Sequence, residues 1–275
     1  MEKQTLSLPQ SLLAAVRRKS RFHIKVGSGK SCTTIASYNI HKCIGTDGRF
    51  DPRRTAGVIA ELGADILALQ EVDERLGTKA GLLDLEAIAR DTGLVPVHNF
   101  PNTRSHGWHG NLVLARTGIV QAVETIKLPG LEPRGALIVD LDIRGIEVRI
   151  IAAHFGLLRH SRSQQAEVLV EATKQVDRPA ILLGDLNEWR VKTRSSLLTL
   201  LPHFGPIGAT IPSFPSRFPL LALDRILARP ANLLDSLEVH QSPLARIASD
   251  HLPLKARLDL SSARLPESLK TAKAA

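Results

Sequence analysis

The stretch Ile181-Leu182-Leu183-Gly184-Asp185-Leu186-Asn187-Glu188-Trp189 joins a short apolar run to a polar end. An uncharged apolar run of this length predicts a buried strand, and the glycine allows the chain to turn where the strand stops. Asp185 and Asn187 are two positions apart, which places both side chains on the same side of an extended segment. A carboxylate can accept a proton from water, and a nearby carboxamide can hold that water or a substrate oxygen. Taken alone, the pair is explained slightly better as an ordinary strand-end turn.

Polar groups at the ends of apolar strands recur along the chain, and this recurrence favours a functional site over a set of turns. Further strands are expected over residues 33–38, 65–69, 147–153, 220–227 and 252–258. The polar groups at or within these segments, or just before the last one, are Asn39, Glu71, His154, Asp224, Asp250 and His251. In layered α/β folds one end of the sheet is the usual place for a site.

The remaining pattern is typical of one α/β domain with mixed sheets. Helices are expected over 51–62, 84–91 and 161–176, and further strands over 112–115, 120–127, 136–143 and 237–240, with a long proline-rich loop over 202–219. No internal repeat or second domain boundary is visible. The interpretation is therefore a catalytic domain over residues 31–260, preceded by a basic extension (1–30) and followed by a tail (261–275).

Composition excludes several classes of protein. Hydrophobic residues make up 43% of the chain, which is ample for a buried core, and no window approaches the roughly 18 apolar residues of a membrane span. Cys32 and Cys43 are too few for a disulfide framework or a zinc cluster, and no secretory signal is visible, so a cytoplasmic protein is expected.

The net charge of +9 lies mainly in the ends of the chain. Residues 1–30 carry seven Lys/Arg against one Glu, whereas residues 31–260 carry 26 Lys/Arg against 25 Asp/Glu. Residues 7–25 combine an apolar stripe with a basic cluster, which suits peripheral contact with an anionic membrane surface or nucleic acid. A solvated, partly frayed tail explains the same stretch at least as well.

The candidate residues favour a hard metal ion and phosphoryl chemistry. Carboxylates and a carboxamide without a cysteine cluster favour Mg²⁺ or Mn²⁺ over zinc. Such ions, together with an Asp/His pair, suit phosphoryl transfer, in which charge on the non-bridging oxygens must be neutralised.

At these residues the sequence resembles the endonuclease/exonuclease/phosphatase superfamily, the metal-dependent phosphoesterases related to DNase I. The matching segments, in the family's order, are SYNIHK (37–42), LALQEVD (67–73), GNLVLAR (110–116), AAHFG (152–156), ILLGDLNEW (181–189), LDRIL (223–227) and SDHLPL (249–254). Longer phrases at 39–54, 132–137 and 242–254 resemble a bacterial subgroup whose substrates are poorly defined. The resemblance implies a four-layer α/β/β/α sandwich of two mixed β-sheets.

The resemblance also implies a role for each residue at the site. Glu71 would be the principal metal ligand, with Asn39 and Asp250 beside the ion as ligands or through water. Asp185 would orient or deprotonate the attacking water, and Asn187 would hold a phosphate oxygen.

The two histidines would act on the phosphoryl group. His251 would contact the phosphate and be oriented by Asp224, as an Asp–His hydrogen bond orients imidazole elsewhere. His154 would stabilise charge in the transition state, although a histidine on an apolar strand is also explained as a core residue. Further candidates for phosphate or head-group contacts are Lys42, Arg104, His109, Asn111, Arg134 and Arg162, of which each charged one is also explained as a solvated charge.

The implied activity is hydrolysis of a phosphodiester by in-line attack of water, with a nuclease-type substrate as the first expectation. Aromatic residues are only 4% of the chain, which leaves few platforms for stacking bases, although a duplex binder could use phosphate contacts. A phospholipid or lipid-linked phosphodiester is the rival substrate. A non-catalytic binding module of the same fold is the alternative from another class.

Overall fold

Eleven strands form two β-sheets in the described part of the chain, which in this computed structural model comprises residues 32–74, 78–98, 104–174, 178–190, 192–201, 203–205 and 210–263. The six-stranded sheet has the order β10-β11-β1-β2-β4-β3, and the five-stranded sheet has the order β5-β6-β7-β8-β9. Each sheet contains one parallel pair, β1 with β2 and β7 with β8, among antiparallel neighbours. Both sheets are therefore mixed, as the sequence predicts.

The element bounds follow the predicted pattern closely. The strands are Thr33–Asn39 (β1), Ile66–Gln70 (β2), Val95–Pro96 (β3), Leu112–Ala115 (β4), Ile119–Leu128 (β5), Arg134–Ile143 (β6), Ile146–His154 (β7), Ala180–Asp185 (β8), Asp224–Arg229 (β9), Leu234–Val239 (β10) and Leu254–Leu258 (β11). The α-helices are Pro52–Leu62 (α2), Leu85–Thr92 (α3), Arg159–Lys174 (α4) and Ala245–Ala248 (α5). Short 3₁₀ helices cover His41–Cys43 (η1), Lys192–Arg194 (η2), Leu198–Leu200 (η3), Ala231–Leu233 (η4) and Leu260–Ala263 (η5).

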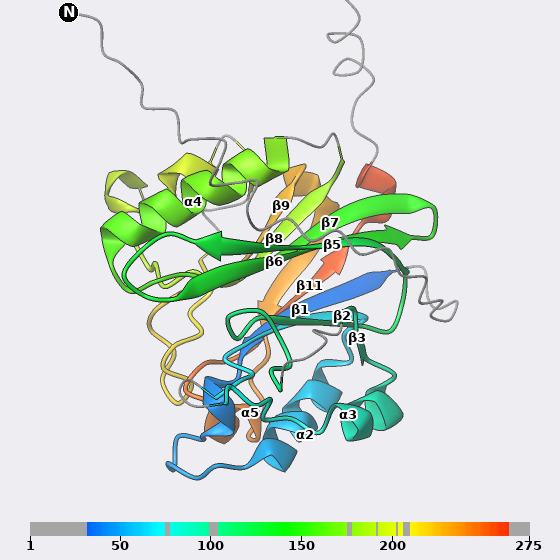
Figure 1. Cartoon of the computed structure of the whole chain (residues 1–275), viewed down its shortest axis with the longest axis vertical. Helices are drawn as coiled ribbons and strands as arrows, with labels where there is room; N and C mark the ends of the chain where they lie inside the picture. Colours follow the sequence, from blue (N-terminus) through cyan, green and yellow to red (C-terminus); the bar gives the residue numbers. More distant parts are fainter. Residues whose placement is uncertain are drawn as a thin grey trace, which may run out of the picture.

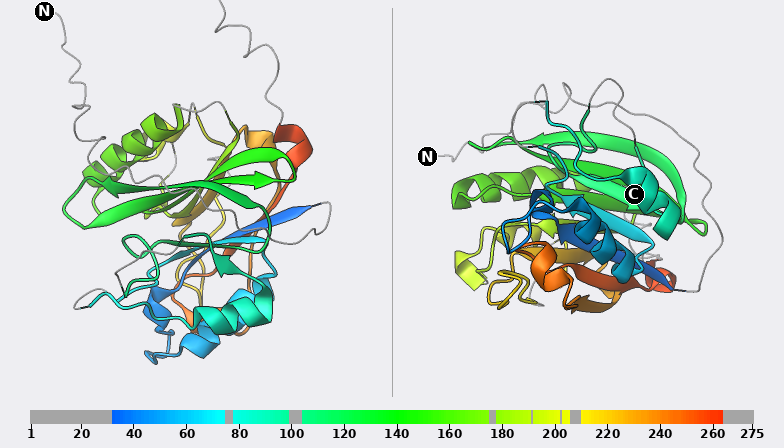
Figure 2. Two further views of the ribbon diagram at one scale, coloured as in Figure 1. Left: turned by 45° about the vertical axis from the view of Figure 1, so that its right-hand side comes forward. Right: turned by 90° about the horizontal axis from the view of Figure 1, so that it is seen from below.

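The layers are stacked in the order helix, sheet, sheet, helix. In Figure 1, α4 lies above the five-stranded sheet, while α2 and α3 lie below the six-stranded sheet. The left view of Figure 2 keeps this order, whereas the right view looks along the stack from the side of α2 and α3. The predicted four-layer α/β/β/α sandwich is confirmed.

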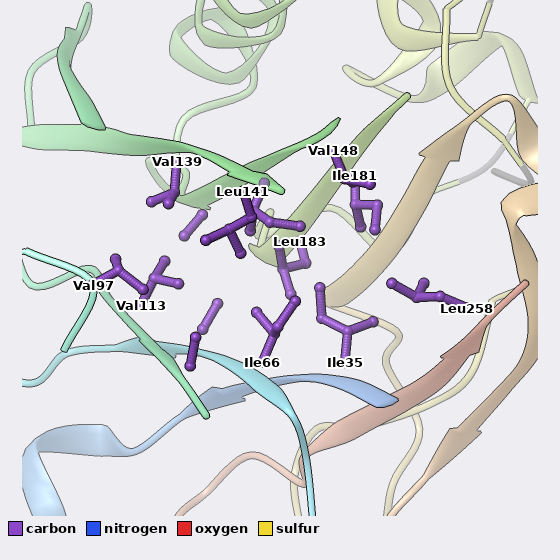
Figure 3. Close-up of a cluster of buried hydrophobic side chains, with 14 of the residues drawn as sticks. Ile35, Ile66, Val97, Val113, Val139, Leu141, Val148, Ile181, Leu183 and Leu258 are labelled. Atoms are coloured by element: carbon purple, nitrogen blue, oxygen red, sulfur yellow. The ribbon is translucent and has the colours of Figure 1, made fainter. Parts of the chain in front are cut away.

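The main core lies between the two sheets, and Figure 3 shows side chains from both sheets meeting there. Ile35 and Ile66 come from the six-stranded sheet, Ile181 and Leu183 come from the five-stranded sheet, and all four are fully buried. Burying a side chain of this size stabilises the fold by about 2 kcal/mol relative to leaving it exposed. The apolar run that precedes Asp185 is therefore part of the shared core, which fixes the position of the strand end.

Helix α2 begins and ends at the residues that local signals predict. The Asp51 carboxylate caps the helix by accepting a hydrogen bond from the Arg54 backbone N–H at 3.0 Å, and Pro52 occupies the first turn. Gly63 ends the helix in the left-handed conformation, with φ of 55°.

The strand directions bring one set of chain ends together. β1 and β2 finish together because they are parallel, and so do β7 and β8. Both pairs finish at one end of the sandwich, because Asn39 at the end of β1 is hydrogen-bonded to Asp185 at the end of β8. The antiparallel strands β4, β6, β9 and β11 begin at that same end, as their register with these neighbours requires. We call this end, with the loops that leave and enter it, the site end. In Figure 1 these loops gather on the left of the view.

Three local features differ from the sequence prediction or were not predicted. Residues 220–223 are not part of a strand; β9 begins at Asp224, because the sheet pairing starts where Asp224 lies opposite Asp185. The segment before it folds on itself through a bridge between Phe214 and Leu221. The two-residue strand β3 and the one-turn helix α5 carry no periodic pattern long enough to predict them.

The two ends of the chain contribute little to this description. Residues 1–31 and 264–275 lie outside the described residues, and so do the predictions made for 1–30 and for most of 261–275. No helix within the described ranges has the length and apolarity to cross a bilayer.

Gly184 is required by the close approach of β7 to β8. Its φ is +143°, and a Cβ atom at this position would lie 1.8 Å from the Ala153 carbonyl oxygen. Both the backbone conformation and the contact exclude a side chain, because the obstructing atom is backbone and cannot rotate away. This glycine sits directly before Asp185 and directly beside the strand that ends in His154.

We predict that Gly184→Ala lowers the free energy of unfolding by about 3 kcal/mol or more, since it forces the β7–β8 pair apart. Urea unfolding followed by circular dichroism measures the change. Gly145→Ala is the matched control: its φ is +81°, but no atom lies within 4 Å of the added Cβ, so it costs about 1 kcal/mol. Equal losses in the two variants would contradict the steric argument.

Candidate active site

The predicted catalytic residues meet where the two sheets face each other at the site end. Asn39 ends β1, His154 ends β7 and Asp185 ends β8, while Asp224 begins β9. The Asn39 side-chain amide donates a hydrogen bond to Asp185 Oδ2 at 3.0 Å, so the bond joins the two sheets across the core. Glu71 directly follows β2 and therefore leaves the six-stranded sheet at this same end.

Asp185 is a buried acceptor with partners at both oxygens. Its Oδ1 accepts the backbone N–H of Asn187 at 2.9 Å, and its Oδ2 accepts the Asn39 amide. The His154 Nε2 lies 3.4 Å from Oδ2 and the His251 Nε2 lies 3.6 Å from the same oxygen. Asp185 is thus held at both oxygens and flanked by two imidazoles.

His251 is held as an imidazolium by carboxylates. Its Nδ1 lies 2.8 Å from Asp224 Oδ2, which also accepts the Ser213 hydroxyl. Burial alone would lower the pKa of His251, but Asp224 and Asp185 raise it to about 10. The ring therefore carries a proton on both nitrogens at neutral pH, and its Nε2–H is directed toward Asp185.

His154 is held neutral by burial and by a cationic neighbour. Burial is the largest cause that lowers the pKa of His154 to about 4, and the Arg134 guanidinium lowers it further, although Asp185 opposes both. Arg134 Nη1 lies 3.0 Å from His154 Nδ1, and a guanidinium can only donate, so Nδ1 accepts and the ring proton lies on Nε2. Glu132 orients Arg134 through two hydrogen bonds of 2.8 and 3.1 Å.

Glu71 and Asp250 form the more accessible part of the site. The Lys42 ammonium is hydrogen-bonded to Glu71 Oε2. Burial alone would raise the pKa of Glu71, but His154, Lys42 and His41 lower it below its ordinary value. Asp250 is about one-third exposed, and its Oδ1 lies 3.7 Å from His41 Nδ1. Glu71 is therefore a carboxylate that already attracts a cation.

Two groups of residues at the site could be considered as holders of a divalent ion. Asp185, Asp224 and His251 offer ligand atoms within 4.8 Å of one another. A protonated imidazole has no free lone pair, however, and His251 gives both nitrogens to carboxylates, so this cluster suits a charge-paired imidazolium better than an ion. Glu71 carries a negative charge matched by a lysine ammonium, and carboxylate and amide oxygens are the ligands that Mg²⁺ and Mn²⁺ prefer.

A cavity of about 680 Å³ opens beside these residues. It is lined by Glu71, His154 and Arg134 from the site. Lys42, Arg104 and His109, which the sequence analysis proposed as phosphate contacts, also line it. Their phosphate-binding roles stay predictions.

Two other predicted phosphate contacts make hydrogen bonds that support loops, and their contact with phosphate stays a prediction. Arg162 is buried, and its guanidinium donates to Ser196 Oγ at 3.0 Å and to the carbonyls of Gly156 and Leu157. The Asn111 amide is also buried and donates to the carbonyls of Trp108, His109 and Gly135. Neither residue lines the cavity. Asn111 holds the loop that positions His109, and Arg162 holds the loop that follows His154.

The Asn187 side chain also serves the backbone. Its amide donates to the Phe155 carbonyl at 2.9 Å, and its φ is +51°. This conformation returns the backbone N–H to Asp185. Asn187 therefore positions Asp185 through its N–H, while contact with a phosphate oxygen stays a prediction.

Sequence reasoning missed Glu132 and Ser213, which support Arg134 and Asp224 respectively. The phrase that begins at Glu132 was noted only as a subgroup feature, and Ser213 lies in the proline-rich loop. No local signal marks either residue as part of the site, because each acts through a neighbour that is itself a site residue.

Comparisons with known proteins show the family and the fold of this chain. The sequence model described as the Endonuclease/Exonuclease/phosphatase family matches residues 36–251. YbhP, an uncharacterized protein of Escherichia coli K12, is 27% identical over 263 residues, which covers 82% of this chain and 96% of YbhP. An endonuclease/exonuclease/phosphatase structure from Beutenbergia cavernae has a TM-score of 0.64 at 21% identity, covering 83% of this chain and 72% of that one. The mannosyl-6-phosphatase Bt3783 of Bacteroides thetaiotaomicron has a TM-score of 0.63 at 18% identity, covering 82% and 99%.

We predict that Asp224→Asn lowers the pKa of His251 from about 10, because it removes the negative charge that lies 2.8 Å from Nδ1. The ring then loses its proton at a lower pH, and NMR titration of the imidazole resonances measures the shift. Ser213→Ala is the matched control, since it removes a hydrogen bond to the same carboxylate oxygen but keeps the charge. An unchanged titration of His251 in Asp224→Asn would refute the charge argument.

Proposed function

Because this chain belongs to the endonuclease/exonuclease/phosphatase family, we propose that it is a divalent-metal-dependent phosphoesterase that hydrolyses phosphodiester bonds by in-line attack of water. The observation that carries the proposal is the environment of Asp185. This carboxylate is fixed at both oxygens and lies between a neutral and a charged histidine. A fixed base flanked by two N–H donors suits proton removal from water beside a negatively charged phosphoryl group.

Asp185 is the proton acceptor in this proposal. Asn39 and the Asn187 N–H hold its two oxygens, so the carboxylate loses little freedom when the reaction begins. The attacking water would approach Asp185 Oδ2, the oxygen that faces both imidazoles.

The two histidines stabilise charge on the phosphoryl oxygens. His251 supplies a formal positive charge, and Asp224 fixes the ring so that Nε2–H points into the site. His154 supplies a neutral N–H donor, because Arg134 occupies its other nitrogen. His251 and His154 thus offer one charged and one neutral N–H donor to the transition state, in which the phosphoryl oxygens carry more negative charge. Asp185 stays ionised and can accept the proton from water.

Glu71, together with Asn39 and Asp250, would hold Mg²⁺ or Mn²⁺. When bound, the ion supplies Lewis-acid stabilisation of a phosphoryl oxygen. The Lys42 ammonium is hydrogen-bonded to Glu71 Oε2, so it lies beside the carboxylate that would bind the ion.

The candidate substrates differ in the groups that are attached to the phosphate. A cavity of about 680 Å³ is large enough for a substituent on the far side of a diester, which supports a diester over a small monoester. Trp108 and His109 are two of the rings in its lining, besides His154, and they give a nucleic-acid substrate a place to stack. A lipid-linked diester is the second candidate, favoured by the exposed apolar side chains around the site.

We predict that Asp185→Asn and Glu71→Gln each reduce kcat on bis(p-nitrophenyl) phosphate by about 10³-fold or more, because each removes a charge used in the reaction. Excess EDTA abolishes hydrolysis by the wild-type protein, and added Mn²⁺ restores it. Asp235→Asn is the matched control, since this exposed carboxylate pairs with Arg257 on β10 and β11. Full activity of Glu71→Gln, or of the wild type in EDTA, would refute the metal mechanism.

The same preparation identifies the substrate class. Plasmid DNA, phosphatidylglycerol vesicles, the chromogenic diester and p-nitrophenyl phosphate are compared at equal phosphate concentration. We expect hydrolysis of the chromogenic diester, and we expect either plasmid DNA or phosphatidylglycerol to be hydrolysed faster than the chromogenic diester. Turnover of the monoester alone would contradict the diester proposal, and no turnover of any compound with Mg²⁺ or Mn²⁺ would favour the non-catalytic alternative.

A further inference from the structure

Exposed large apolar side chains are concentrated at the site end. Of the ten such side chains in the described residues, eight lie in connections that leave or enter the strands there, with Ile247 in the one-turn helix α5. These eight are Phe50, Leu131, Leu157, Leu158, Trp189, Phe218, Leu220 and Ile247. The other two, Leu198 and Leu201, lie at η3, where the β8–β9 connection packs on α4 and runs to Gly205, which pairs with Ala228 near the far end of β9. Within the described chain, no loop at the opposite end of the sandwich contributes an exposed large apolar side chain. Isolated exposed apolar residues are ordinary, but a one-sided set of eight marks an interaction surface.

Five of these loops place an arginine directly beside the apolar residue. The pairs are Arg49 with Phe50, Leu158 with Arg159, Trp189 with Arg190, Arg217 with Phe218, and Arg246 with Ile247. The Arg190 guanidinium lies over the Trp189 ring, 4.4 Å from its centroid. Arg49, Arg159 and Arg217 are exposed. We call the eight apolar side chains and these five arginines the rim.

Several rim loops are in direct contact with one another. The Thr46 backbone N–H donates to the Ile247 carbonyl at 3.0 Å, and Arg217 Nε donates to Thr46 Oγ1 at 3.0 Å. On the other side of the site, the Leu157 N–H donates to Glu132 at 2.8 Å, next to Leu131. The rim is therefore built from loops that support each other, and it includes the turn that borders the cavity at Glu132.

We propose that the rim docks this protein on the surface of a bilayer that contains anionic phospholipids. Leucine, isoleucine, phenylalanine and tryptophan side chains enter the boundary between head groups and acyl chains, and adjacent arginines pair with lipid phosphates. The rim supplies apolar side chains and arginines in the same loops. This combination matches a boundary where acyl chains lie next to anionic head groups. Docking in this way would present the cavity to the head groups.

Single-stranded nucleic acid fits the rim less well. Sequence-tolerant binding of bases uses aromatic platforms along a basic groove. Five of the eight apolar rim residues are leucine or isoleucine, which offer no ring for stacking. Leu131, at 86% exposed, is the most accessible of the eight. Aliphatic side chains exposed to this degree suit acyl chains better than bases.

The test measures binding rather than turnover, so its failure is separate from a failure of the proposed reaction. The full-length protein is sedimented in EDTA with vesicles of phosphatidylcholine alone or with 30% phosphatidylglycerol. We expect binding to the anionic vesicles, and at least about a tenfold loss of partitioning in Leu131→Ser/Phe218→Ser/Leu220→Ser. Arg217→Glu weakens binding to anionic vesicles in the same direction. Leu198→Ser/Leu201→Ser, with two exposed leucines outside the rim, binds as the wild type does.

A second readout reports the position of one rim residue. Tryptophan emission shifts to shorter wavelength when the anionic vesicles are added, and the shift is lost in Trp189→Phe, which leaves Trp108 as the remaining tryptophan. Unchanged melting temperatures confirm that the variants are folded.

Three outcomes would overturn the proposal. The first is equal vesicle binding by the triple rim variant and the wild type. The second is loss of binding in Arg17→Glu/Arg18→Glu with no loss in the rim variants, which would assign membrane contact to residues 7–25 instead. The third is a rim variant that loses affinity for single-stranded DNA while vesicle binding stays the same.

Discussion

The hydrogen bond from the Asn39 amide to Asp185 connects the two sheets at the point where their strands end. The two residues are 146 positions apart, so only the packing of one sheet against the other brings them together. The core between the sheets, with Ile35 and Leu183 fully buried, sets the distance between the strand ends. The geometry at Asp185 therefore depends on the whole sandwich, and a change deep in the core would alter the site without touching it.

The same enclosed space holds two histidines in different protonation states. Both rings are buried, and burial alone would make both neutral. Asp224 reverses this tendency at His251, whereas Arg134 reinforces it at His154. The difference lies in one neighbour for each ring, since Asp185 lies near both. One carboxylate, Asp224, and one guanidinium, Arg134, thus give the two histidines different protonation states.

The sequence carries the parts of this structure that are local. Apolar runs mark the strands, and the Asp51 cap marks the start of α2. Contacts between distant segments are not written in any short pattern. Arginine side chains are usually solvated, yet Arg162 is buried and donates to a backbone carbonyl in the loop after β7. Glu132 supports the loop at Leu157, 25 residues later, and no spacing rule indicates that contact. The register that starts β9 at Asp224 likewise depends on β8.

The direction of the strands explains why site and rim occupy the same end. A parallel pair needs a crossover, so the chain returns to the opposite end through α2 after β1 and through α4 after β7. The strands β1, β2, β7 and β8 all end at the site end, and the connections there carry both the candidate site residues and the exposed apolar residues. Glu71 and Asn187 have left-handed backbone conformations just beyond strand ends, which non-glycine residues adopt at a cost of about 1–3 kcal/mol each. The shared core offsets that cost, so chemistry and contact with a surface can both reside in the least regular part of the molecule.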